Sequence, residues 1–404
     1  MQTFTPGQDG YREEIAGFQT GIQSTPKLVV AARTADDIAE AVRHAAAHDL
    51  RVAVQATGHG LRAPADGVLI STTRMQAVEI DAVNAVARVE AGTTWGKVLE
   101  AAAAHGLAPL SGSAPGVGVV GYTLGGGFSL LGRRYGLAAG QVRSADVVTA
   151  DGAIERTTDL GDGVIASLEF GLVRVTSLYG GGLSFDTPKL PEVLRTWRDW
   201  TADLPDALTT SLALIPYPDL PMVPEPLRGK HIAHVRIAHL GDDGPRLVAP
   251  LRALRPLVDT LKTMPFTDSG SIAAEPPHPH AYLGDNRVVA QLPDTTIDAI
   301  LEHAGPGAPV PTVLIVDLLG GAYARPNGPD FTADSTADFT AQSRYTIRAL
   351  SVLDESGPDT VRRAHAELFV RLTATGRLRS FVYGQPLSHV DLKFSSEHPT
   401  PAAR

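Results

Sequence analysis

The first sixty residues alternate between short apolar runs and one amphipathic segment. Apolar runs over residues 27–32 and 50–55 predict strands, and the segment that starts at Thr34 repeats apolar residues at helical spacing. This pattern predicts a strand-helix-strand unit with parallel strands and a right-handed crossover. The second strand leads directly into Gly58-His59-Gly60, a loop whose bare backbone can approach a ligand closely.

The chain continues with short elements up to about residue 175. Apolar stretches cover 68–71 and 85–90, a helix is expected over 94–105, and residues 142–158 predict a hairpin. A glycine-rich tract over 112–127 interrupts these elements, and its composition excludes a plain helix or strand.

From about Thr176 the pattern changes to longer strands that alternate with helices, as in an antiparallel sheet backed by helices. The expected strands cover 177–185, 209–215, 231–239, 310–318 and 345–352. The expected helices cover 191–202, 246–261 and 359–374, and the expected loops cover 266–282 and 325–338.

Composition narrows the function classes. The 404 residues include no cysteine, which excludes disulfides, thiolate metal ligands and cysteine nucleophiles. The net charge of -9 provides no basic footprint for nucleic acid or an anionic membrane, so a small-molecule substrate is expected. The N-terminal segment is polar and no run approaches the ~18 apolar residues of a membrane span, so a cytoplasmic protein is expected.

The glycine tract formally contains G-x-G-x-x-G at Gly116, Gly118 and Gly121. A Rossmann site needs a strand directly before this motif and a helix directly after it, and neither pattern is present. A loop that wraps an anionic cofactor with main-chain amides is one interpretation of the tract. A turn that only lets two elements pack closely is the other.

Histidines provide the candidate chemistry. His59 lies between two glycines and is sterically open, so its imidazole suits a nucleophile or an attachment point, although a lone histidine is more often exposed or capping. His234 and Arg236 share one face of the expected strand 231–239 and are candidates to line a substrate cavity. His278 and His280 have no third ligand at metal spacing, so no metal site is expected.

Several motifs in one order resemble a known family. They are Val52-Ala-Val-Gln-Ala-Thr-Gly-His-Gly60, Ala91-Gly92 with Trp95, Gly118-Val-Val-Gly-Tyr-Thr-Leu-Gly-Gly-Gly127, Arg134-Tyr-Gly-Leu137 and Val147-Val-Thr-Ala-Asp-Gly152. From Leu28 to about Phe185 the chain resembles the FAD-linked oxidases of the vanillyl-alcohol-oxidase and para-cresol-methylhydroxylase (PCMH) type, in the berberine-bridge-enzyme-like branch.

The resemblance implies an α+β fold: a two-part PCMH-type FAD-binding domain over 1–175, a substrate domain over 176–375 with an antiparallel sheet backed by helices, and a divergent C-terminal segment over 376–404. It implies FAD as cofactor, with His59 at the position that bonds covalently to the flavin 8α-methyl. The implied cofactor-binding residues are Gln55, Ala56, Thr57, Gly58, His59, Gly60, Gly112, Ser113, Gly118, Gly121, Tyr122, Leu124, Gly125, Gly126, Gly127 and Val164.

The chain also departs from this family. About ten residues that relatives carry after the equivalent of Leu160 are missing, and the ending that returns to the FAD domain in relatives is not found after Gly384. Both segments pack near the flavin in relatives, so flavin is either held by other segments or lost.

Three functions follow as hypotheses. The first is an FAD-dependent oxidoreductase that oxidises a small-molecule secondary metabolite by hydride transfer to flavin, with O2 as acceptor. Tyr122, Tyr135, His234 and Arg236 are its candidate catalytic residues near the substrate. The second is a non-redox cyclase or isomerase of natural-product biosynthesis on a degenerate scaffold, and the third is a metabolite-binding protein without catalysis.

Overall fold

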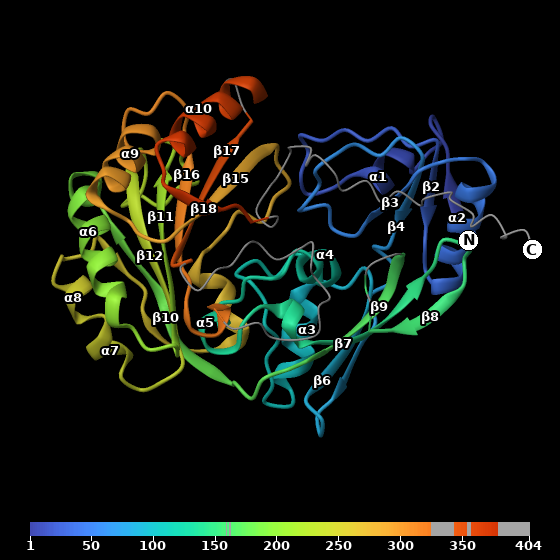
Figure 1. Cartoon of the computed structure of the whole chain (residues 1–404), viewed down its shortest axis with the longest axis horizontal. Helices are drawn as coiled ribbons and strands as arrows, with labels where there is room; N and C mark the ends of the chain where they lie inside the picture. Colours follow the sequence, from blue (N-terminus) through green and yellow to red (C-terminus); the bar gives the residue numbers. More distant parts are fainter. Residues whose placement is uncertain (159, 161–162, 325–342, 354–356, 379–404) are drawn as a thin grey trace, which may run out of the picture.

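The computed structural model describes residues 1–158, 160, 163–324, 343–353 and 357–378. Strands in these ranges form three sheets that follow one another along the longest axis of the molecule (Figure 1). The first two sheets are built from residues before 172 and the third from residues after 176.

The first sheet has the order β1-β2-β4-β3. Its strands are β1 (Gln2–Phe4), β2 (Leu28–Ala31), β3 (Val52–Gln55) and β4 (Val68–Ser71). Helix α2 (Ala35–Ala47) joins β2 to β3, and the Thr34 hydroxyl caps it by accepting from the Asp37 amide at 3.2 Å. The strands β2 and β3 are parallel as expected, but β4 lies between them and pairs with both.

The second sheet is antiparallel, with the order β5-β6-β9-β7-β8. Its strands are β5 (Val78–Asp81), β6 (Val86–Glu90), β7 (Val142–Val148), β8 (Ile154–Thr157) and β9 (Val164–Gly171). The expected hairpin is confirmed, and Gly152 takes φ 79° in its turn. The helices of this half are α1 (Tyr11–Ile15), α3 (Trp95–Ala103), α4 (Val119–Leu124), α5 (Gly132–Tyr135) and the 3₁₀ helix η1 (Ala138–Gln141).

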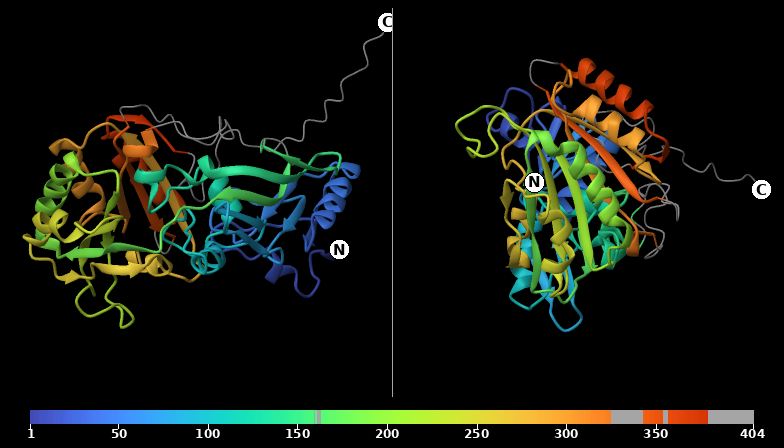
Figure 2. Two further views of the ribbon diagram at one scale, coloured as in Figure 1. Left: turned by 90° about the horizontal axis from the view of Figure 1, so that it is seen from below. Right: turned by 90° about the vertical axis from the view of Figure 1, so that its left-hand side faces the viewer.

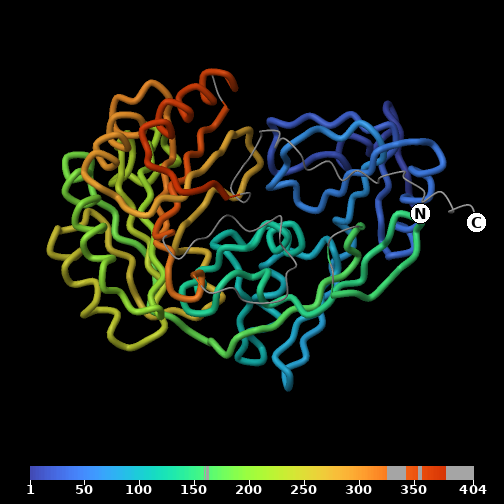
Figure 3. The backbone as a smooth tube through the Cα atoms, viewed as in Figure 1, coloured from blue at the N-terminus to red at the C-terminus, as the bar shows by residue number. Residues whose placement is uncertain are grey.

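The third sheet is antiparallel at every pairing in the described ranges, as expected (Figure 3). Its order is β13-β10-β12-β11-β16-β17-β15-β18, with β14 also paired to β10. The strands are β10 (Ser177–Phe185), β11 (Leu208–Pro216), β12 (His231–His239), β13 (Val258–Asp259), β14 (Lys262–Pro265), β15 (Tyr282–Val289), β16 (Val313–Leu318), β17 (Tyr345–Val352) and β18 (Ala374–Gly376).

Helices cover the outer face of this sheet, the face directed away from the first two sheets (Figures 1 and 2). They are α6 (Leu190–Trp200), α7 (Gly244–Leu247), α8 (Ala249–Arg252), α9 (Asp294–Ala304) and α10 (Pro358–Val370), with the 3₁₀ helices η2 (Thr187–Lys189), η3 (Thr201–Asp203), η4 (Phe266–Ile272) and η5 (Gly321–Ala324) elsewhere. Trp197 of α6 is fully buried against Leu212, Val235 and Ile347 of the sheet. Alternate residues of these strands therefore face the helices, and the residues between them face the first half of the molecule.

The prediction of a single helix over 246–261 is wrong. The chain forms two short helices there, and Arg255, which precedes Pro256, takes φ 54°. A residue before proline is disfavoured in the helical region, so the helix ends and Leu257 instead donates to the Ser184 carbonyl. The loop expected over 266–282 contains η4, and the expectations missed β15 and α9 altogether. The expected loop 325–338 lies outside the described residues.

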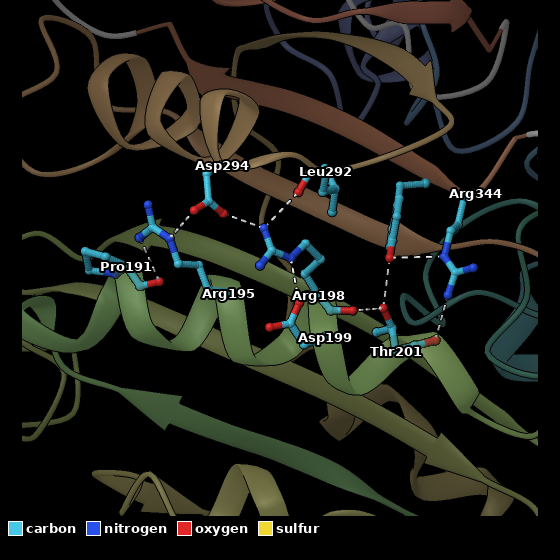
Figure 4. A network of polar contacts seen from close by, with 9 residues as sticks. Pro191, Arg195, Arg198, Asp199, Thr201, Leu292, Asp294 and Arg344 are labelled. Carbon is cyan, nitrogen blue, oxygen red and sulfur yellow. Dashed lines mark hydrogen bonds and ion pairs between the residues drawn. The ribbon is translucent and has the colours of Figure 1, made fainter.

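A polar network fastens α6 to the neighbouring elements (Figure 4). Asp294, the first residue of α9, accepts from Arg198 at 2.5 Å and makes an ion pair with Arg195 at 3.4 Å. Asp199 and Asp294 hold the pKa of the Arg198 guanidinium above its usual value. At the end of α6 the Thr201 and Tyr345 hydroxyls lie 2.9 Å apart, which links the helix layer to β17.

Within the part of the chain that the structure describes, no helix is long and apolar enough to cross a membrane.

A buried histidine makes stability depend on pH. The His365 side chain of α10 is 2% exposed and its Nε2 lies 3.0 Å from the Ser351 hydroxyl of β17. Burial lowers the pKa of His365 to about 4. Because the unfolded chain binds this proton more tightly, folded-state stability falls as the pH drops from about 6.5 towards 4.

We expect His365→Gln, which keeps a partner for Ser351, to lose less stability between pH 8 and pH 5 than the wild type. The difference is about 2 kcal/mol for one histidine with this shift. Urea unfolding at the two pH values measures it, and equal losses in both proteins would contradict the assignment.

Candidate functional site

Two glycine-rich loops from distant parts of the sequence meet at one threonine. Strand β3 runs into the loop 56–60, and the Thr57 hydroxyl accepts from the Gly118 amide at 3.3 Å. The same hydroxyl lies 2.9 Å from Nδ1 of His59. A Cβ on Gly116 would lie 3.8 Å from the His59 ring. The loop around His59 and the tract 112–118 therefore form one surface.

The N-terminal segment packs against this surface through Gly17 and Phe18. Gly58 takes φ 71°, and a Cβ there would lie 2.6 Å from the Gly17 Cα. Phe18 donates its amide to the Thr57 carbonyl at 3.0 Å, and its ring stacks on the His59 imidazole with centroids 3.9 Å apart at 11°. Only a glycine at position 58 permits this approach.

The third sheet reaches the same place. The Tyr282 hydroxyl, at the start of β15, donates to the His59 carbonyl at 2.6 Å. Upstream of β15, Glu275 accepts from the Ser113 hydroxyl at 2.7 Å. Both glycine-rich loops are thus bonded to the segment that leads into β15, and the site lies between the two halves of the molecule.

His59 is electrically neutral at pH 7. Burial lowers its pKa to about 4, and nearby His280 lowers it further, while Glu275 opposes the change. Nδ1 is bonded to Thr57, and Nε2 makes no hydrogen bond to any described residue. An uncharged imidazole with one uncommitted nitrogen is the form that can act as a nucleophile or attachment point.

The two glycine-rich loops present open backbone. A Cβ placed on Gly60 or Gly121 would meet no atom within 4 Å. Leu124, in the same helix α4 as Gly121, is 38% exposed. Bare peptide groups beside an exposed apolar side chain suit a long ligand with both polar and flat apolar parts, and the residues present therefore fit FAD.

Other residues expected to bind the cofactor make packing contacts within the protein. Tyr122 lies edge-on to Trp95, with ring centroids 5.2 Å apart, and a Cβ on Gly112 or Gly127 would meet its ring at 3.2 or 2.7 Å. Tyr122 thus fills the space under the glycine tract. Tyr122 is half-buried in this position, and its expected roles at the cofactor and at the substrate stay predictions.

The last glycines of the tract 112–127 also make contacts within the protein. Gly126 and Gly127 take positive φ, and their carbonyls accept from Ala139 and Ala138. Gly125 closes α4 by donating to the Gly121 carbonyl. The Val164 side chain is 3% exposed inside the core of the first half. Gln55 is 3% exposed, and its amide donates to the Ile15 and Ala16 carbonyls, which fixes the end of β3.

The four candidate catalytic residues do not form one group. Tyr135 packs against the apolar cluster around Leu110, Leu131 and Phe266. His234 and Arg236 share the inner face of β12, as expected. Burial lowers the pKa of His234 to about 4, and its ring lies between the Ser184 hydroxyl at 3.0 Å and the Ile272 carbonyl at 3.2 Å.

Three site residues escaped the sequence analysis: Phe18, Glu275 and Tyr282. Phe18 and Glu275 lie in irregular segments with no periodicity, and Tyr282 begins a strand that the pattern did not reveal. The pair Pro276-Pro277 marks a loop beside Glu275, and no pattern in the sequence indicates that this loop folds back onto Ser113.

Comparisons with known proteins agree with this geometry. Residues 26–158 match the FAD binding domain family. The chain is 27% identical over 231 residues to an FAD-linked oxidoreductase of Dictyostelium discoideum, which covers 53% of this chain and 51% of that protein. It is 33% identical over 137 residues to (R)-6-hydroxynicotine oxidase of Paenarthrobacter nicotinovorans, or 33% of this chain and 30% of that protein. The chain therefore matches about half or less of the length of these relatives.

Solved structures resemble nearly the whole chain. The crystal structure of 6-hydroxy-D-nicotine oxidase from Arthrobacter nicotinovorans superposes on this chain with a TM-score of 0.75 at 20% sequence identity. The match covers 95% of this chain and 88% of that structure. BBE-like 1 of Physcomitrella patens has a TM-score of 0.76 at 17% identity, covering 92% and 87%.

The chain has the fold of the PCMH-type FAD-linked oxidases, as expected from its motifs. A protein named BBE-like is among the solved structures that share this fold, and residues 26–158 form the FAD-binding domain of the chain. FAD, the expected cofactor, is confirmed at the level of this domain.

The close approach at Gly58 generates a prediction. Gly58→Ala places a methyl group 2.6 Å from the Gly17 Cα at a positive φ, so we expect a loss of roughly 1–3 kcal/mol in unfolding free energy. Gly60→Ala, two residues away in open space, is the matched control and should stay within about 0.5 kcal/mol of wild type. Urea unfolding of the three proteins measures both, and equal stability of the two variants would refute the packing argument.

Proposed function

We propose that this protein is an FAD-dependent oxidoreductase that oxidises a small-molecule secondary metabolite by hydride transfer to flavin, with O2 as final acceptor. The observation that carries the proposal is the meeting of the loop 56–60 and the tract 112–118 within the FAD-binding domain, directly beside the third sheet. Its relatives include proteins named FAD-linked oxidoreductase and oxidase.

The chain's own groups divide the work of binding. The peptide groups of 56–60 and 118–121 would hold the pyrophosphate and ribityl parts of FAD, and Leu124 would offer an apolar contact. Phe18 and Thr57 hold the His59 ring in a fixed orientation. FAD would supply the redox chemistry when bound, because its flavin accepts a hydride, that is, two electrons and one proton.

A single covalent bond between a ring nitrogen of His59 and the flavin 8α-carbon is part of the proposal. This bond would replace one C–H bond of the methyl group, with the proton released to solvent and the two electrons passing through the flavin to O2. The ring is neutral, its Nε2 is uncommitted, and glycines on both sides leave it accessible. Because the chain has no cysteine, a second link through sulfur is excluded.

The inner face of the third sheet provides the substrate side. His234 and Arg236 lie there, beside the segment that contacts Ser113 and His59 through Glu275 and Tyr282. This arrangement supports a division at about residue 175 into an FAD-binding domain (1–175) and a substrate domain (176–375). Leu160, after which the comparison with the family predicts missing residues, is buried in the core of the second sheet.

The spectrum of the purified protein tests the proposal. We expect a yellow protein with flavin absorbance, and a precipitate in acid that retains the flavin because it is covalently bound. His59→Ala should bind flavin and release more than nine-tenths of it into the acid supernatant. His280→Ala, a neighbouring histidine outside the loop, should behave as wild type.

A colourless protein that takes up no added FAD would refute the oxidoreductase proposal. It would favour a non-redox cyclase or isomerase on this scaffold. Flavin that stays with the precipitated His59→Ala chain would refute the covalent link alone.

A further inference from the structure

A buried guanidinium on the inner face of the third sheet lacks a hydrogen-bond partner. Arg236 lies in the middle of β12, with β10 and β11 on either side. It is 9% exposed, and its Nε is enclosed without an acceptor. No other guanidinium nitrogen of Arg236 is bonded within the described ranges. An arginine side chain carries five donors in a rigid fork, so an acceptor is missing here.

The acidic groups nearby are already engaged. Asp317 of β16 accepts two hydrogen bonds from Arg348, at 2.8 and 2.9 Å, and a third from Thr346 at 2.7 Å. Glu275 accepts from the Ser113 hydroxyl. These carboxylates influence Arg236 through space without bonding to it.

Charged groups act on Arg236 only through space. Burial lowers the pKa of its guanidinium, Glu275 and Asp317 oppose this change, and the like charge of Arg348 adds to it. The adjacent His234 ring is neutral, because burial and Arg236 both lower its pKa. A buried guanidinium that no acceptor satisfies destabilises the fold.

The residues paired with Arg236 across the sheet do not satisfy its guanidinium. They are Gly182 on β10 and Ser211 on β11. The His234 ring lies over Gly182, and it bonds to Ser184 and Ile272 instead of Arg236. Glu275 lies close enough to influence the pKa of both Arg236 and His59. The unpaired fork therefore lies on the side of the sheet where the flavin site is.

We propose that the guanidinium of Arg236 binds an ionised carboxylate of the substrate, so that the molecule oxidised at this site is an organic acid. The assignment to a substrate rests on the proposed oxidoreductase function. A carboxylate matches the fork with two parallel hydrogen bonds, and it supplies the acceptors that the protein's own acids do not provide.

Binding of a charged and a neutral probe of the same shape tests this inference. We expect benzoate to bind the purified holoprotein at least tenfold more tightly than benzamide at pH 7.5, by isothermal titration calorimetry. Arg236→Met should abolish this preference while benzamide binding and flavin absorbance stay unchanged. It should also raise the Tm of the ligand-free protein, because it removes an unpartnered buried charge. Arg236→Lys should keep a reduced preference for benzoate.

Arg287→Met is the matched control. Arg287 is also an arginine of the third sheet, but its guanidinium stacks 4.5 Å over Phe369 and pairs with Asp285. This variant should keep the preference for benzoate, and its Tm should fall.

Three results would overturn the inference: equal affinities for benzoate and benzamide in the wild type, a lower Tm in Arg236→Met, or loss of flavin from that variant. The second would make Arg236 a structural residue, and the third would assign it to a phosphate of the cofactor. A yellow protein with equal affinities would refute only the carboxylate site. A colourless protein that prefers benzoate through Arg236 would refute only the oxidoreductase proposal.

Discussion

The site depends on how closely two stretches of bare backbone can approach His59. The Thr57 hydroxyl fixes the distance between the two glycine-rich loops, because it accepts from Gly118 and contacts the imidazole at the same time. Gly58 rests on Gly17 at a separation that no side chain permits, and this contact brings Phe18 under the imidazole. The glycines of these loops therefore have a specific physical role. Phe18 and Thr57 fix the orientation of the His59 ring, and the rest of the ring is left open.

The same constraint couples the two halves of the molecule. Tyr282 belongs to the third sheet, yet its hydroxyl binds the His59 carbonyl and its own amide donates to the Gln19 side chain at 3.3 Å. Ser113 and Glu275 make a second link between the glycine tract and the segment before β15. A second set of polar contacts joins the halves elsewhere, where Arg133 donates to the Leu204, Pro205 and Leu208 carbonyls. The links at Tyr282 and Glu275 are those that connect the third sheet to His59 and the glycine tract.

Local patterns predicted much of the fold. The predicted bounds of β10, β12 and β17 agree with the structure, because all three strands contribute residues to the core beneath the helices. The long helix over 246–261 failed because Pro256 excludes the helical conformation at Arg255, a rule that periodicity ignores. Within the site, His59 and the glycine loops were visible as a motif. Phe18 and Glu275 were not, because they reach it through tertiary contacts of irregular segments, which leave no repeating pattern in the sequence.

Burial has different consequences for the histidines and the arginines near the site. It keeps His59 and His234 uncharged at pH 7, because an imidazole can release its proton at modest cost. A guanidinium cannot do so in a protein, and it stays charged at any depth. Arg348 is hydrogen-bonded to Asp317, whereas Arg236 has no such partner in the described chain and Glu275 acts on it only through space. Under the proposed carboxylate site, this difference separates a ligand-binding arginine from a structural one.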